Sequence, residues 1–216
     1  MIEGLKACCN EFRPDPFRFE WGGATWVGAT NNCAMAAVQT DDQEALAAAT
    51  GNAIGDPEAY DVLAPTGEGV PVSLAALRAW CNEGPRVEPC TECGGTREWK
   101  CRTCKGTGKT EHDCDCDHCT VTDEEECPNC DGVRHFPCEE CEDGTQEAVL
   151  PGVLAGVVVN RTLLAKALAS APQEGTVMLA TRGDKCVNLF APWWRAAVMA
   201  YRHSPEGVSV FHNESA

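Results

Sequence analysis

The sequence predicts an α+β fold in which two repeats, each a helix with antiparallel strands, are interrupted by a cysteine-rich β-hairpin module. Three observations lead to this prediction. Residues 90–141 hold 11 of the 16 cysteines of the 216-residue chain. The flanks alternate apolar and polar residues with the periods of short helices and strands. The same order of predicted elements, a helix and then three strands, occurs on both sides of the cysteine-rich stretch.

In the first flank, a short helix is expected over residues 2–10, where apolar side chains recur at helical spacing. Alternating aromatic and charged residues then predict a strand over residues 17–21. Ser73 is expected as the N-cap of a helix that ends near Cys81. The other elements expected here are two strands, a short helix and a glycine-rich connector, at residues 25–30, 33–39, 41–50 and 51–70.

The second flank opens with a buried strand at residues 157–159, where three valines are consecutive. Asn160 is expected to cap a helix that runs to about Ser170, with Leu164 on its apolar face. Three more strands follow, and the C-terminal residues are expected to form a loose tail. The strands are expected at residues 176–181, 186–190 and 194–201. The predicted organisation is therefore residues 1–85 and 148–203 as two halves of one domain, residues 86–147 as an insertion and residues 204–216 as a tail.

Four Cys-x-x-Cys pairs begin at residues 90, 101, 127 and 138, so the first two and the last two pairs have the same spacing. A Cys-x-x-Cys turn directs two thiolates at one metal ion, and zinc takes four such ligands in a tetrahedron. Four pairs therefore predict two zinc ions. Glycines after the second cysteine of a pair permit the positive φ that such a turn needs. Disulfides and a thioredoxin-like redox pair are the alternatives.

These pairs resemble the DnaJ-type zinc finger, whose repeat is Cys-x-x-Cys-x-Gly-x-Gly. The segment CRTCKGTG at residues 101–108 matches that repeat in full, and the other three pairs match it with fewer glycines. No His-Pro-Asp triplet occurs, so the resemblance does not extend to a J domain. It implies that the outer pairs share one zinc ion and the inner pairs share the second. The implied ligands are Cys90, Cys93, Cys138 and Cys141 for the first ion, and Cys101, Cys104, Cys127 and Cys130 for the second.

A fifth cluster, which the resemblance does not include, lies between the two halves of the cysteine-rich stretch. It offers five ligands for a third zinc ion, and the alternative is an acidic loop with free thiols. Its members are His112, Cys114, Cys116, His118 and Cys119.

The chain is strongly acidic, with a formal net charge of −16. Residues 86–147 hold seven Lys and Arg against seventeen Asp and Glu, a net charge of −10. Such a segment binds phosphates poorly, so a protein is the expected partner of the zinc module. The sequence has no apolar run of membrane-spanning length and no secretory signal at residues 1–20, which predicts a cytoplasmic protein.

The flanks resemble a domain of the DNA polymerase sliding clamp (beta clamp). The resemblance is carried by FRFEWGGATWVGATNNCAMAAV, by AYDVLAP and by GVVVNRTLLAKALASAP with the final strand. It implies a clamp-like α+β domain whose helices face DNA. The basic residues that it would place there are Lys6, Arg78, Arg161 and Lys166; the alternative is that these are ordinary solvated charges. The chain holds one such domain, so encirclement of DNA requires an oligomeric ring.

The sequence contains no nucleophile elbow, phosphate-binding loop or dinucleotide fingerprint. Complete four-thiolate sites leave no open position on zinc for a substrate. We therefore expect a non-enzymatic zinc-binding protein that acts as a protein-interaction module. The alternatives are a DNA sliding-clamp-like factor in replication or repair and a chaperone-like or thiol–disulfide protein.

Overall fold

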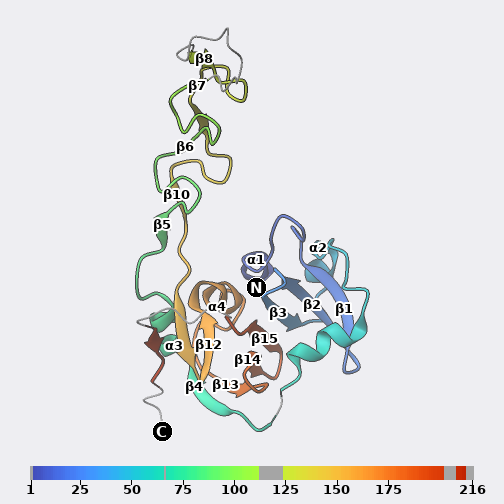
Figure 1. Cartoon of the computed structure of the whole chain (residues 1–216). Coiled ribbons are helices and arrows are strands. Elements are labelled where there is room, and N and C mark those ends of the chain that lie inside the picture. Colours follow the sequence, from blue (N-terminus) through green and yellow to red (C-terminus); the bar gives the residue numbers. More distant parts are fainter. Residues whose placement is uncertain (1, 66, 112–123, 202–207, 213–216) are drawn as a thin grey trace. The chain divides into compact units, whose positions relative to one another are not determined.

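The computed structural model describes residues 2–65, 67–111, 124–201 and 208–212 (Figure 1). The chain divides into two compact units. The larger unit consists of Met1–Gly84 and Val149–Ala216, and the smaller one, here called the cysteine module, is Pro85–Ala148. An α+β architecture with a large antiparallel sheet is thus present, as the sequence predicts.

A seven-stranded sheet forms the centre of the larger unit, as far as this unit is described, and all its neighbouring strands are antiparallel. Its strand order is β1-β2-β3-β15-β14-β13-β4. The strands are β1 (Phe17–Trp21), β2 (Ala24–Thr30), β3 (Ala34–Gln39), β15 (Trp194–Met199), β14 (Cys186–Ala191), β13 (Thr176–Thr181) and β4 (Val70–Ser73).

The first six strands of this order come from two similar repeats. One repeat is α1 (Ile2–Lys6) followed by β1, β2 and β3, and the other is α4 (Arg161–Leu168) followed by β13, β14 and β15. The repeats join where β3 pairs with β15, with Ala36 opposite Ala196. Both alanines are fully buried, and α4 packs on both strands, so small side chains at the junction let the helix lie close to the sheet.

Each face of the sheet has its own core. On the helix face, side chains such as Ala36 and Ala196 pack with Leu164 and Trp194. Residues that alternate with these along β3 and β15 lie on the other face. There the 3-10 helix η1 (Pro57–Leu63) covers an aromatic cluster, in which the rings of Phe19 and Tyr60 stack with centroids 4.1 Å apart.

Helix starts agree with the predicted caps. The Ser73 hydroxyl accepts a hydrogen bond from Ala76 N at the start of α3 (Leu74–Cys81), and Asn160 Oδ1 accepts one from Thr162 N at the start of α4. Asp42 does the same for Glu44 N in α2 (Gln43–Ala48). These side chains satisfy backbone amides that have no partner inside the helix.

Three expectations need correction. The first helix ends at Lys6 rather than near residue 10, and Asn10 instead accepts a hydrogen bond from Arg13 N in a turn. The connector expected over residues 51–70 contains η1, which Asp56 caps. The tail was expected to be loose, but β16 (Ser209–Val210) pairs in parallel with β11 (Pro151–Leu154), which also pairs with β12 (Val157–Asn160).

The cysteine module is built from short antiparallel ladders, three in its described part. They follow one another along the hairpin (Figure 1). The ladders are β5 (Val87–Pro89) with β10 (Thr145–Glu147), β6 (Glu98–Lys100) with β9 (His135–Pro137), and β7 (Lys109–Glu111) with β8 (Glu124–Glu126). Among the residues that the structure describes, no helix is long and apolar enough to cross a membrane.

Candidate metal centres

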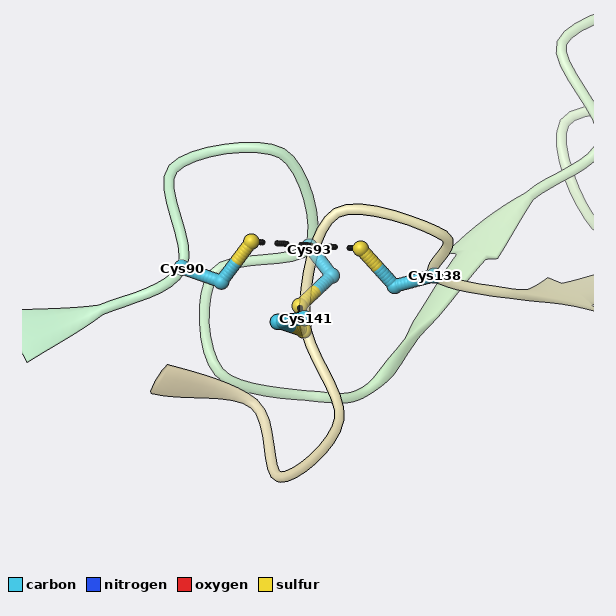
Figure 2. Close-up of side chains that lie close together, drawn as sticks. All are labelled: Cys90, Cys93, Cys138 and Cys141. Atoms are coloured by element: carbon cyan, nitrogen blue, oxygen red, sulfur yellow. Dashed lines mark hydrogen bonds between the residues drawn. The ribbon is translucent and has the colours of Figure 1, made fainter. Parts of the chain in front are cut away.

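The outer group lies between the β5–β10 and β6–β9 ladders. Cys90 and Cys93 come from the loop that follows β5, and Cys138 and Cys141 come from the loop that follows β9. Figure 2 shows the four side chains converging from these two loops. The sulfur of Cys90 lies 3.8 Å from that of Cys138, and the sulfur of Cys93 lies 3.6 Å from that of Cys141.

The inner group repeats this arrangement between the β6–β9 and β7–β8 ladders. The sulfur of Cys101 lies 3.8 Å from that of Cys127, and the sulfur of Cys104 lies 3.7 Å from that of Cys130. All four side chains are at most 5 % exposed. Within each group, every sulfur lies within 4.8 Å of the other three. The structure therefore brings together the same four residues, in each group, that the DnaJ-type resemblance implies.

These distances fit zinc. Four sulfurs at about 2.3 Å from a tetrahedral zinc ion lie about 3.8 Å from one another. A disulfide bond instead needs sulfurs about 2.05 Å apart, and all thirteen cysteines in the described part of the chain are free thiols. Two centres of four cysteines each are thus compatible with two zinc ions.

The electrostatics of the groups also favour a cation. Burial and the neighbouring sulfur of Cys93 raise the pKa of Cys141 to about 12. Burial likewise raises the pKa of Cys130 to about 11. Four thiols at this separation cannot all ionise unless positive charge is placed among them, and a divalent cation supplies that charge.

The turns around the cysteines depend on left-handed backbone. Gly94, Gly106 and Gly132 have φ angles of 60°, 85° and 76°, as expected from their place in the repeat. At the last pair, a Cβ on Gly144 would lie 2.5 Å from the carbonyl oxygen of Gly95, so the two loops of the outer group approach too closely for a larger residue.

Hydrogen bonds to sulfur further define the inner group. Gly108 N donates to Cys104 Sγ at 3.3 Å, and Asn129 Nδ2 donates to Cys101 Sγ at 3.6 Å. The amide of Cys104 and the side chain of Asn129 lower the pKa of Cys101 to about 6. Donors of this kind stabilise a metal-bound thiolate.

Sequence reasoning missed three residues that shape these centres. Asn129 is one, and its place between Cys127 and Cys130 was the available signal. Thr96 and Thr107 are the others, and each Oγ1 donates to the carbonyl oxygen of the preceding ligand cysteine, Cys93 or Cys104. These threonines occupy equivalent positions in the first two repeats, so the spacing that relates the cysteine pairs also relates them. The five candidates for a third zinc ion, His112, Cys114, Cys116, His118 and Cys119, lie outside the described residues.

The four basic residues expected at DNA have different surroundings. Arg161 is only 7 % exposed, and its Nη1 donates to Trp80 O at 2.6 Å. Arg78 donates to the carbonyl oxygens of Leu168, the last residue of α4, and of Ala171 and Gln173, which follow it. Lys6 is exposed and Lys166 is half-buried. The structure therefore does not place the four on a common solvated surface.

Comparisons with known proteins do not assign the chain to a family. No protein-family model matches the chain, and no curated protein sequence matches it. Among solved structures, it is similar to DNA polymerase III subunit beta from Borrelia burgdorferi in complex with a natural product, with 9 % sequence identity and a TM-score of 0.42. The match covers 94 % of this chain and 62 % of that chain.

Proposed function

We propose that this chain is a non-enzymatic zinc-binding protein whose cysteine module, held by two zinc ions, is a protein-interaction module. The observation that carries the proposal is the grouping of eight cysteines into two sets with the sulfur spacing of tetrahedral zinc. The finger is DnaJ-type in its repeat, and it is inserted into a domain that is clamp-like in its predicted plan.

Zinc would be structural in this module. In the described part of the cysteine module, the buried clusters consist of the ligand cysteines themselves, with Phe136 packed against the inner group. Ladders of three residues per strand do not hold together in water without a core. Metal binding would supply the folding free energy that a hydrophobic core supplies elsewhere.

The donor set argues against catalysis. A catalytic zinc ion keeps one position open for water or substrate, whereas four thiolates fill the coordination sphere. Both groups are complete sets of four, and seven of the eight cysteines are buried. The zinc ions would therefore stiffen the hairpin without reacting.

Charge and exposed apolar side chains support a protein as the partner. The module is acidic, and each four-thiolate centre would add a net charge of about −2 when zinc is bound. Val87, Trp99 and Val133 are 59 %, 38 % and 63 % exposed. Exposed aromatic and aliphatic groups on a rigid scaffold are typical of binding surfaces for proteins.

A DNA-encircling factor and a thiol–disulfide protein are the alternatives. The first predicts a closed oligomer with salt-sensitive DNA binding. The second predicts zinc release and paired oxidation of the cysteines. The intramolecular contacts of Arg78 and Arg161 disfavour the first, and the complete four-thiolate sets disfavour the second.

Native mass spectrometry of the purified chain tests the proposal, because it reports zinc content and oligomeric state together. We expect at least two zinc ions per chain and, after loss of zinc to a chelator, loss of protein partners in a cross-linking assay. Chains without zinc, or partners that remain after zinc is removed, would overturn it. A closed oligomer that binds DNA would favour the clamp alternative.

A further inference from the structure

A cavity of about 300 Å³ opens on the cysteine module beside the outer group. Residues that lie between the two cysteines of three different pairs meet there: Glu92 from the first pair, Arg102 from the second, and Glu139 and Glu140 from the fourth. Trp99 and Lys100 of β6 complete the wall, and Cys138 of the outer group also lines it. Zinc at the two groups would fix these loops, and hence the cavity.

Trp99 offers an aromatic surface to this cavity. Its ring lies 4.9 Å from that of Phe136, its partner across the β6–β9 ladder, at an interplanar angle of 30°. Phe136 in turn packs against the inner cysteines, so the ring that Trp99 contacts is itself held by the inner group. The side chain is nevertheless 38 % exposed. A tryptophan ring is the best aromatic platform for a cation.

The charges around the cavity favour a cationic ligand. Three exposed glutamates, Glu92, Glu139 and Glu140, line the cavity together with two exposed basic residues, Lys100 and Arg102. Cys138 belongs to a centre that would carry about −2 when zinc is bound, so the surroundings are negative overall. Lys100 and Arg102 would repel a run of consecutive cations, and they therefore favour a single cationic side chain.

We propose that this cavity docks one lysine or arginine side chain from an extended segment of a protein partner. The cationic head would lie over the Trp99 ring and among the three carboxylates, where charge complementarity and the aromatic face act together. The proposal rests on the proposed function, since it names the partner chemistry of the same zinc-held module. A phosphate or a nucleic acid would meet an excess of negative charge there.

Fluorine NMR of the full, zinc-loaded chain labelled with 5-fluorotryptophan tests this docking. The chain has six tryptophans, and Trp99→Phe assigns the resonance of Trp99. The probes are a capped Gly-Gly-Arg-Gly-Gly peptide, the same peptide with norleucine in place of arginine, and inorganic phosphate. We expect the arginine peptide alone to shift the Trp99 resonance saturably, with weaker binding at high salt.

Two variants separate the cavity from general acidity. The double variant Glu139→Gln/Glu140→Gln should weaken peptide binding about fivefold, because it removes two carboxylates beside the docked cation. Asp131→Asn removes a carboxylate of the same module outside the cavity, and asparagine tolerates the φ of 45° at this position, so binding should be unchanged.

The outcomes also distinguish this proposal from the proposed function, when zinc is counted on the same sample. Two zinc ions with an unmoved Trp99 resonance would overturn the docking proposal and leave the interaction module standing. A shift caused equally by norleucine, a shift caused by phosphate, or equal weakening by Asp131→Asn would also overturn it. A chain without zinc would overturn the proposed function itself.

Discussion

Arg161 shows how a single charged residue can lie in a core. Its guanidinium lies 5.4 Å from the centre of the Trp80 ring, donates to Trp80 O, and has Glu83 at 3.9 Å as its ion-pair partner. A pattern of apolar and polar residues treats arginine as polar, and it therefore predicts that an arginine in a helix lies on the exposed face. The long side chain instead donates a hydrogen bond to the Trp80 carbonyl between two helices, which only the tertiary contact makes possible.

Thiol reactivity is predictable at the same scale. Burial, followed by the charge of Cys9, raises the pKa of Cys8 to about 12, so the reactive thiolate of Cys8 is scarce at pH 8. Cys33 is exposed. We expect iodoacetamide at pH 8 to modify Cys33 rapidly and Cys8 only after unfolding, as measured by peptide mass spectrometry. Equal rates for the two cysteines in the folded chain would contradict the burial of Cys8 in the core.

At the scale of elements, α4 is held by its apolar face. Leu164 is fully buried among the helix-face core of the sheet. Leu164→Ala should lower the free energy of unfolding of the larger unit by about 2–5 kcal/mol, measured by urea titration with tryptophan fluorescence. Val70→Ala truncates an aliphatic side chain that is 56 % exposed and should cost less than about 0.5 kcal/mol. Similar losses for the two variants would refute the packing of α4.

The inner group should behave as one element of the cysteine module. Cys101→Ser removes one of four thiolate ligands, so the chain should hold one zinc ion fewer by native mass spectrometry. Hydrogen exchange should quicken in β6, β7, β8 and β9 and stay unchanged in the seven-stranded sheet. Cys33→Ser, an exposed cysteine outside both groups, is the matched control. If the sheet lost protection together with the module, the two units would not be independent.

The elements themselves were predictable to different degrees. Caps at Ser73 and Asn160, and strands with clear alternation such as β1, follow from local chemistry, and the structure confirms them. The strand β16 was not predictable, because a strand of two residues is too short to show an alternation of apolar and polar side chains. It exists because β11 offers it a free edge and because the Phe211 ring packs against Trp80 with centroids 5.4 Å apart.

At the scale of the whole molecule, the cysteine module is an insertion whose first and last residues lie next to each other. Ala148 N donates to Arg86 O at 3.0 Å, so the two ends of the module are adjacent. Replacing residues 87–147 by a short glycine–serine linker should leave the larger unit folded, since loop-closure entropy changes slowly with length. The expected result is a zinc-free protein whose urea midpoint matches that of the larger unit in the full chain. Insoluble or unfolded protein would show that the larger unit depends on the module.

The sequence by itself determined the residue types and local geometry of the metal centres. Two thiolates per Cys-x-x-Cys turn and glycine at the left-handed positions follow from short-range chemistry, and so do the helix caps. Spacing alone leaves open which pairs join, and here the resemblance to a known finger indicated the nested arrangement that the structure shows.

Only the tertiary structure decided the rest. The pairing of β3 with β15, the burial of Arg161 and the cavity beside Trp99 each join residues that are distant in sequence. Such contacts depend on shape and packing over the whole unit, and a local pattern of apolar and polar residues is compatible with many of them.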